Sequence, residues 1–330
     1  MLEIYGTLGP SCGQEETLKQ MLELGMTGVR LNLSHVTLAQ AEPMVEALQR
    51  ASQSVGVTPR LLIDMQGPEI RVGAMASPTH LIEGKNILLN QRGGIPLPKV
   101  ITDILEPGME LWMDDGKLRV EVFEAQGWLR GRVIQGGVLL SRKSVAIPGR
   151  ELWLPALSEI DRENLRAAKE YGVTGVMQPF VRSREDLEAV RAELEENGCS
   201  GVRLFAKIEN RVGLEKLEEL LPACDEIVIA RGDLGNAVPL WELPRVQKEM
   251  AALCRKHRKP FMVVTQMLAS MEHSPVPTRA EVSDIFNAVL DGAASVMVTG
   301  ETAAGEHPVE VIRYLVATAR EAEIYRKRGS

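Results

Sequence analysis

The chain has 330 residues, of which 45% are hydrophobic and 25% charged, and a formal net charge of −7. This length accommodates one large barrel domain with a small insert, or two ordinary domains. The negative charge argues against a nucleic-acid partner bound through a broad basic surface. Because the sequence has no apolar run of membrane-spanning length and no signal-peptide pattern, we expect a cytoplasmic protein with no membrane partner.

The four cysteines, Cys12, Cys199, Cys224 and Cys254, are scattered along the chain. None of them forms a C-x-x-C pair, which argues against a zinc site. Their scatter also argues against a disulfide framework and fits a reducing compartment.

The first part of the chain alternates strand and helix patterns. Short apolar runs predict strands at Ile4–Leu8, Gly28–Leu33 and Arg60–Met65. Longer amphipathic stretches predict helices at Glu15–Leu24 and within Leu38–Gln53. This order is typical of β/α units.

The pattern changes between residues 72 and 147, where no long helical periodicity occurs. Turn signals at 114–116 and 135–137 separate short β-like runs. These runs are Asn86–Leu89, Glu110–Met113, Leu118–Phe123 and Trp128–Val133. We therefore expect a small all-β lid domain at residues 72–147, inserted into a catalytic domain formed by residues 1–71 and 148–330.

Alternation resumes at Ser158 and continues along the rest of the chain. The further strand candidates are Val173–Met177, Val202–Ile208, Glu226–Ile229, Phe261–Thr265 and Ser295–Val298, each followed by a helical stretch. Their runs are apolar throughout, as in parallel strands that are buried on both faces. About eight β/α units predict an α/β fold, a (β/α)₈ TIM barrel with the lid inserted after the third strand.

Polar residues gather where the predicted strands end, which is where (β/α)₈ barrels place their chemistry. Lys207 and Glu209 lie two apart on one strand, so their side chains share a face. Asp233 follows the next strand and can converge with them. Two carboxylates suit Mg²⁺ or Mn²⁺, and a nearby lysine would neutralise charge on a transferring phosphoryl group or an enolate.

Other strand ends carry two further sets of polar groups. Arg30 and Arg71 offer planar donors suited to phosphate oxygens. Asn32, Ser34 and Asp64 form an oxygen-rich set suited to a monovalent cation.

Each of these residues also has a purely structural interpretation. Lys207 and Glu209 can form a structural ion pair, and Asp233 after a glycine can be a helix N-cap. Asn32 and Ser34 can cap the following helix. The functional interpretation is favoured because six predicted strand ends carry polar groups at the same end of one barrel.

Long, ordered motifs over nearly the whole chain resemble the pyruvate kinase family. They are Thr7–Ser11 (TLGPS), Leu24–Met26 (LGM), Arg30–His35 (RLNLSH), Gly67–Arg71 (GPEIR), Ala206–Asn210 (AKIEN), Ala230–Gly235 (ARGDLG), Thr265–Leu268 (TQML), Pro277–Val282 (PTRAEV) and Gly300–Ala303 (GETA). The resemblance implies transfer of phosphate from phosphoenolpyruvate to ADP, which gives pyruvate and ATP in glycolysis.

The resemblance also implies roles around the substrate. Glu209 and Asp233 would bind Mg²⁺ or Mn²⁺. Lys207 would stabilise the phosphoryl group in flight and then the enolate, and Thr265 would belong to the proton-delivery network. The backbone of Gly232 and Asp233 would hold the substrate carboxylate.

A K⁺ site and a nucleotide site are implied in the same way. Asn32, Ser34, Asp64 and the carbonyl of Met65 would bind K⁺, and Glu69 matches the form that the family associates with K⁺ dependence. The residues that would face the phosphates of ADP or ATP are Arg30, His35, Arg71 and Lys143.

Several positions depart from the family pattern. Met65 and Gln66 replace Thr-Lys, and Val36 replaces a glycine. Pro179 replaces a serine, and Ala146 replaces an asparagine. Because the sequence ends after the eighth helix, we expect the C-terminal effector domain to be absent, with no regulation by sugar phosphates. The barrel helix near residues 277–290 would still allow a homodimer.

Two other functions compete with this kinase interpretation. One is a metal-dependent lyase or aldolase that acts on pyruvate enolate, which needs no nucleotide and so makes no use of Arg71 or Lys143. The other is a specialised or non-catalytic paralogue that binds a modified enolpyruvate phosphate, which the substitutions at Val36, Ala146 and Pro179 favour.

Overall fold

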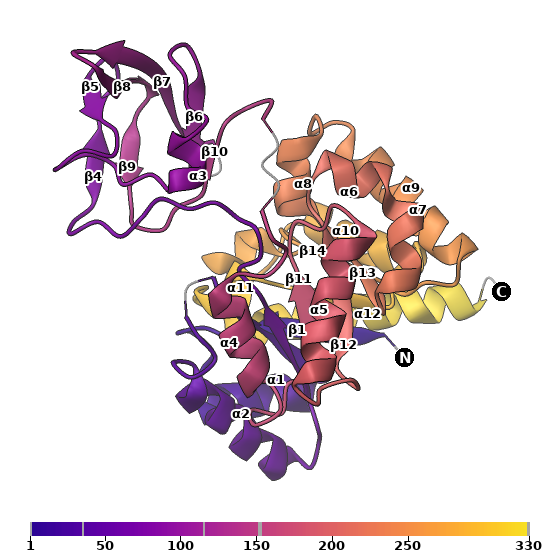
Figure 1. Cartoon of the computed structure of the whole chain (residues 1–330). Helices are drawn as coiled ribbons and strands as arrows, with labels where there is room; N and C mark the ends of the chain where they lie inside the picture. The colour runs from indigo at the N-terminus through magenta and orange to yellow at the C-terminus, as the bar shows by residue number, and fades with distance from the viewer. Residues whose placement is uncertain (1, 35, 115, 151–153, 329–330) are drawn as a thin grey trace. The chain divides into compact units, whose positions relative to one another are not determined.

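The computed structural model describes residues 2–34, 36–114, 116–150 and 154–328. The chain divides into two compact units, one of Met1–Gly67 with Pro155–Ser330 and one of Pro68–Leu154. The second unit interrupts the first in sequence (Figure 1). The boundaries expected from the sequence, 71/72 and 147/148, both lie inside the second unit.

Within the described residues, parallel strands close into a barrel in the order β1-β15-β14-β13-β12-β11-β3-β2. The strands of the barrel are β1 (Glu3–Thr7), β2 (Gly28–Asn32), β3 (Arg60–Asp64), β11 (Gly175–Gln178), β12 (Arg203–Ile208), β13 (Glu226–Ala230), β14 (Phe261–Val264) and β15 (Ser295–Met297). The predicted (β/α)₈ barrel is confirmed, and the insert follows its third strand as expected.

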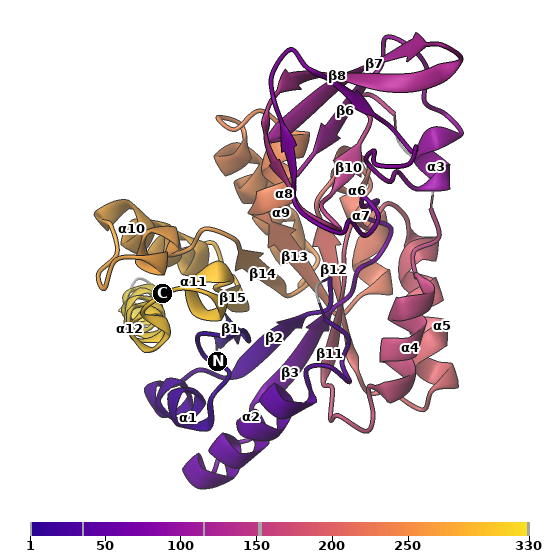
Figure 2. The ribbon, with the colours of Figure 1, turned by 90° about the vertical axis from the view of Figure 1, so that its left-hand side faces the viewer.

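Helices connect the strands and surround the barrel (Figure 2). The longer ones are α1 (Glu15–Leu24), α2 (Glu42–Val55), α4 (Glu159–Ala167), α5 (Arg184–Glu196), α9 (Leu243–Lys256), α10 (Arg279–Leu290) and α12 (Pro308–Arg328). The shorter ones are α6 (Arg211–Glu215), α7 (Leu217–Leu220), α8 (Arg231–Ala237), α11 (Gly300–Ala303) and the 3₁₀ turns η1 (Leu221–Ala223) and η2 (Ala269–Glu272). No helix in the described ranges combines the length and apolar character needed to cross a membrane.

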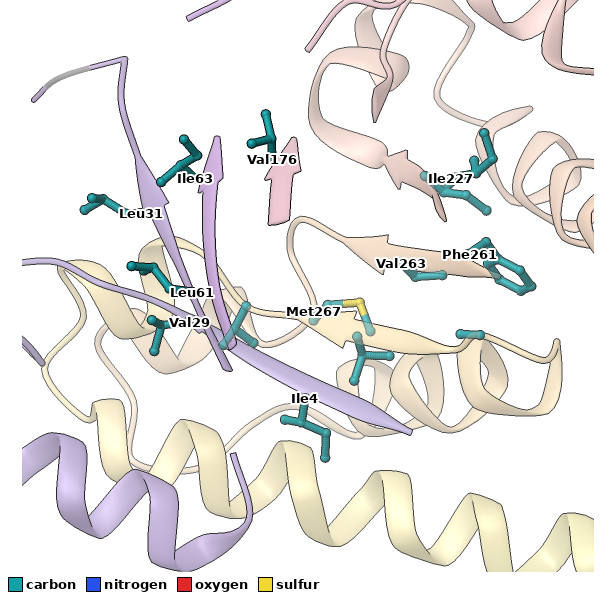
Figure 3. Packing of buried hydrophobic residues seen from close by; sticks show 14 of the residues in the cluster. Ile4, Val29, Leu31, Leu61, Ile63, Val176, Ile227, Phe261, Val263 and Met267 are labelled. Carbon is teal, nitrogen blue, oxygen red and sulfur yellow. The ribbon is translucent and has the colours of Figure 1, made fainter. Parts of the chain in front are cut away.

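Along most barrel strands, successive apolar residues belong alternately to two hydrophobic cores. One contains only strand residues and fills the interior of the barrel, with Tyr5, Phe205 and Met262 among its members. The intervening residues, such as Ile4 and Val263, belong to a second core that also includes the helices (Figure 3). Because successive strand side chains point to opposite faces, this arrangement requires apolar residues at every position, as the sequence shows.

The insert has a hydrophobic core of its own. It contains an antiparallel sheet in the order β10-β6-β7-β8-β5 and a second sheet of β4 and β9. The strands are β4 (Thr79–Leu81), β5 (Asn86–Leu88), β6 (Glu110–Met113), β7 (Leu118–Ala125), β8 (Trp128–Gln135), β9 (Gly137–Leu139) and β10 (Val145–Ala146). One helical turn, α3 (Lys99–Thr102), follows Pro98 and was not expected in an all-β insert.

A polar network closes the end of the barrel where the strands begin. Arg203 pairs with Glu3 at 3.0 Å and also with Glu226, which accepts a hydrogen bond from Ser295. Tyr5 donates its hydroxyl to Glu3 at 2.5 Å. Burial raises the pKa of Glu226 to about 7, although Ser295 and Arg203 favour the charged carboxylate.

Candidate active site

Asp64 lies at the centre of the opposite end of the barrel, where β3 ends. Its carboxylate accepts a hydrogen bond from Arg30 Nε at 2.8 Å and lies 3.1 Å from Lys207 Nζ. These residues come from β2, β3 and β12, and Asp64 is buried. The strand ends thus bring two cationic side chains onto one buried carboxylate at the same end of the barrel.

Glu209 holds Lys207 from its other side. Its Oε1 lies 3.0 Å from Lys207 Nζ, and its Oε2 accepts a hydrogen bond from the backbone N–H of Phe180 at 3.0 Å. Phe180, which follows β11, has a positive φ of 51°, an uncommon conformation for a residue other than glycine. Lys207 is therefore fixed between two acids from neighbouring parts of the barrel.

The charges of this cluster stabilise one another. Burial opposes ionisation of Asp64, but Lys207 and Arg30 hold the pKa of its carboxyl below its usual value. Burial likewise opposes the charged form of Lys207, but Asp64 and Glu209 raise the pKa of its ammonium group above its usual value. Lys207 is thus a fully charged ammonium group in a site shielded from water.

The residues expected at a monovalent cation lie beside this cluster. Asn32 ends β2, and its Oδ1 accepts the backbone N–H of Ser34 at 3.1 Å. Met65 is buried, and its N–H bonds the carbonyl of Met177 at 3.2 Å. Because helix α2 starts only at Glu42, Asn32 and Ser34 do not cap it, and that alternative interpretation is wrong.

Thr265 directly follows β14 in an unusual backbone conformation. Its φ is +81°, which is rare for a β-branched residue. Arg231 donates to the carbonyl of Thr265 at 2.6 Å, and Asp284 on α10 pairs with Arg231 at 2.7 Å. A Cβ added to Gly232 would lie 3.2 Å from the Thr265 side chain, so these two residues are neighbours.

Asp233 is in the first turn of helix α8, whose N-cap is Ala230, so its interpretation as an N-cap is wrong. It follows β13, which pairs with the β12 strand that leads to Glu209. Within the part of the chain that the structure describes, no group of three or more His, Cys, Asp or Glu side chains is arranged to hold a metal ion. Mg²⁺ needs only one or two carboxylates when substrate oxygens and water complete its shell, so the donor types of Glu209 and Asp233 fit it.

Two of the residues expected at the nucleotide, Arg71 and Lys143, belong to the insert unit, whereas Arg30 belongs to the barrel unit. Arg71 donates to the carbonyl of Arg142 at 2.8 Å and pairs with Glu69. Lys143 pairs with Asp114 at 2.7 Å. His35, the third residue expected there besides Arg30, lies outside the described residues.

Three residues that structure the site were assigned no role from the sequence. Arg231 donates to the Thr265 carbonyl, and Asp284, 53 positions further along the chain, pairs with Arg231. Asp161 is buried and bonds the backbone beyond β3. Only Asp161 had a local signal, because Ser158-x-x-Asp161 is a capping-box pattern that predicts a helix start.

The fold and the strand-end cluster define a (β/α)₈-barrel protein with a candidate phosphate-handling site and an inserted β unit. The family description "Pyruvate kinase, barrel domain" matches residues 1–312. The chain belongs to the pyruvate kinase family, which confirms the resemblance in its motifs.

Named relatives agree over almost the whole chain. A pyruvate kinase of Aeropyrum pernix is 38% identical over 324 residues, which cover 97% of this chain and 70% of the relative. Human pyruvate kinase PKLR is 38% identical over 343 residues, covering 97% and 59%. A pyruvate kinase of Geobacillus stearothermophilus is 34% identical over 333 residues, covering 97% and 57%. The chain thus spans 57% to 70% of the length of these relatives.

Proposed function

We propose that this chain transfers phosphate from phosphoenolpyruvate to ADP and so produces pyruvate and ATP. The observation that carries the proposal is Lys207, a charged ammonium group held between the carboxylates of Asp64 and Glu209 at 3.1 and 3.0 Å. Membership in the pyruvate kinase family supports the same reaction.

Lys207 acts on the phosphoryl group in flight and then on the enolate that remains. Its ammonium group contacts both oxygens of Asp64 and Oε1 of Glu209, which fixes the position of its charge at the strand ends. A fixed positive charge at a site of developing negative charge favours the transition state over the ground state. Arg30 on β2 binds the phosphate, and Thr265 contacts the substrate near the enolate carbon, where a proton must be delivered.

Glu209 and Asp233 hold the divalent cation, Mg²⁺ or Mn²⁺, through carboxylate oxygens. When bound, the ion would offset the negative charge of the phosphate. The backbone of Gly232 and Asp233 binds the substrate carboxylate. Asn32, Ser34, Asp64 and the carbonyl of Met65 form the K⁺ site.

The nucleotide side uses Arg30, His35, Arg71 and Lys143 for the phosphates of ADP and ATP. The insert acts as a lid that excludes water during transfer. A second copy of the chain binds through barrel helices near residues 277–290, which gives a homodimer.

One assay separates this function from its rivals. Pyruvate formation from phosphoenolpyruvate is followed with and without ADP, K⁺ and Mg²⁺. The proposal expects turnover only when ADP and Mg²⁺ are both present, with stimulation by K⁺. Turnover without ADP instead indicates a lyase or a phosphatase, and no turnover in any mixture indicates a specialised or non-catalytic paralogue.

A further inference from the structure

Asp161 is a buried carboxylate surrounded by four hydrogen-bond donors. Its Oδ1 accepts the backbone N–H of Gln66 at 2.8 Å. Its Oδ2 accepts the backbone N–H of Gly67 at 3.1 Å, the backbone N–H of Ser158 at 2.9 Å and the hydroxyl of Ser158 at 2.7 Å. A capping residue of helix α4 needs only the Ser158 bonds, so the other two bonds require another explanation.

The donors come from both chain segments that connect the barrel to the insert. The barrel unit ends at Gly67 and resumes at Pro155. Sheet-like pairing ends at Met65, whose N–H bonds Met177, and Asp161 binds the next two N–H groups. The following residue, Pro68, has no N–H to donate.

Two further contacts fix the same segments. Gly67 has a positive φ of 62°, and a Cβ added to it would lie 2.5 Å from Pro179 Cγ, so its backbone is pressed against the loop after β11. On the returning segment, the carbonyl of Ala156 accepts a hydrogen bond from the buried Gln178 at 2.9 Å. The backbone is thus held up to the point where the insert begins.

We propose that Asp161 is a positioning residue that fixes both connections of the insert and thereby the turn after β3. Asp64 lies two residues before Gln66, so the same bonds set the backbone that carries Asp64 toward Lys207 and Arg30. The catalytic consequence rests on the proposed function, whereas the anchoring of the two connections does not.

Asp161→Asn tests the anchoring without an activity assay. The asparagine amide keeps one acceptor oxygen and turns an N–H₂ group toward backbone N–H groups. Hydrogen exchange measured by mass spectrometry is expected to be at least about tenfold faster in peptides that cover residues 65–68 and 156–159, and unchanged in β13. Unchanged exchange in both connections overturns the proposal.

Glu193→Gln is the matched control. Glu193 on α5 is also a buried carboxylate, and it pairs with Arg162 of α4, the helix that carries Asp161. Its partners Arg162 and Asn197 lie outside the two connections. The control is expected to leave exchange at residues 65–68 as in the wild type. Faster exchange there would indicate general loosening and would overturn the proposal.

Hydrogen exchange of the wild-type chain provides a second test of the anchoring, which applies even when the variant does not fold. The amides of Gln66 and Gly67 are expected to exchange at least about 100-fold more slowly than those of an unstructured chain. Unprotected amides at these positions overturn the proposal.

Steady-state kinetics then test the catalytic consequence. Asp161→Asn is expected to lower kcat about tenfold, to raise the K⁺ concentration for half-activation and to leave the KM for ADP nearly unchanged, because Asp64 is displaced. An unchanged kcat with faster exchange contradicts the positioning role. An inactive wild type contradicts the proposed function alone, because the exchange data still test the anchoring.

Discussion

The carboxylate of Asp64 and the ammonium group of Lys207 lie 3.1 Å apart at the end of the barrel where the strands finish. Residues 64 and 207 are brought together by two strands that are separated in the barrel by β11. Arg30 contacts the same carboxylate at 2.7 Å. The three side chains therefore form one electrostatic unit, and changes in any of them affect the other two.

Lys207→Met should abolish phosphoryl transfer while the fold persists. Loss of the only ammonium group placed against Asp64 and Glu209 in the described site should lower kcat by about 10³-fold or more. Asp64 keeps Arg30 and Glu209 keeps the Phe180 N–H, so unfolding free energy should fall by only about 1–3 kcal/mol. A coupled assay and urea unfolding measure both effects.

Lys256→Met serves as the control for that substitution, because Lys256 is an exposed lysine that also pairs with a carboxylate, that of Glu218. It should leave both kcat and stability close to the wild type. A wild-type kcat in Lys207→Met would refute the proposed mechanism.

Asp284→Asn should reduce kcat although Asp284 lies on helix α10, away from the strand ends. It pairs with Arg231, which donates a hydrogen bond to the carbonyl of Thr265. Thr265 has a positive φ, which is unfavourable for a β-branched residue. Weakening the ion pair between Asp284 and Arg231 should displace Thr265 and lower kcat about tenfold. Kinetics on the variant measure this, with Glu249→Gln as a control, because Glu249 is an exposed carboxylate on α9 that also pairs with an arginine, Arg245. Equal loss in both variants would argue against this pathway.

Lys143→Ala should raise the KM for ADP more than the KM for phosphoenolpyruvate, because this lysine is assigned to the nucleotide phosphates. Loss of one ammonium–phosphate contact should raise it about tenfold. Lys117→Ala is a matched control, since Lys117 reaches the same Asp114 at 3.7 Å whereas Lys143 reaches it at 2.7 Å. Equal effects of both substitutions on the KM for ADP would speak against a nucleotide role for Lys143.

Glu226 should make stability depend on pH. Burial raises its pKa in the folded state to about 7, above the value of 4.5 for a free glutamate. Between these values the folded chain retains a proton on Glu226 that the unfolded chain has released, so the stabilisation from this group is complete below pH 4.5 and is lost as the pH rises through 7. The expected loss is about 3 kcal/mol.

Glu226→Gln isolates this effect, because titrating groups that are distant from Glu226 contribute equally to both proteins. Urea unfolding at a series of pH values should show wild-type stability declining relative to the variant as the pH rises. Parallel curves for the two proteins would show that Glu226 is already ionised at low pH in the folded state.

The barrel and the Lys207 cluster were predictable because their signals are local. Continuous apolar runs mark strands buried on both faces, and the two-residue period of a strand places Lys207 and Glu209 on one face. Strand ends of a (β/α)₈ barrel meet at one end, so Asp64 and Arg30 could be expected near Lys207.

The rest of the site depends on contacts between distant residues. Asp161 looks like an ordinary capping residue in sequence, and its bonds to Gln66 and Gly67 span 95 and 94 positions. The positive φ of Thr265 has no sequence signal, since threonine normally avoids that region. Arg231 donates to the carbonyl of this residue, a contact that forms only when β13 and β14 lie side by side.

The shared carboxylate of Asp161 places the exit and the return of the insert next to each other on the barrel. The N–H groups of Gly67 and Ser158 lie 3.1 and 2.9 Å from the same oxygen. A gene in which codons 68–154 are replaced by those for a short glycine-rich turn should therefore still encode a closed barrel. Because the insert has its own hydrophobic core, it should be replaceable as a unit. A domain of different specificity should then be accepted between Gly67 and Pro155.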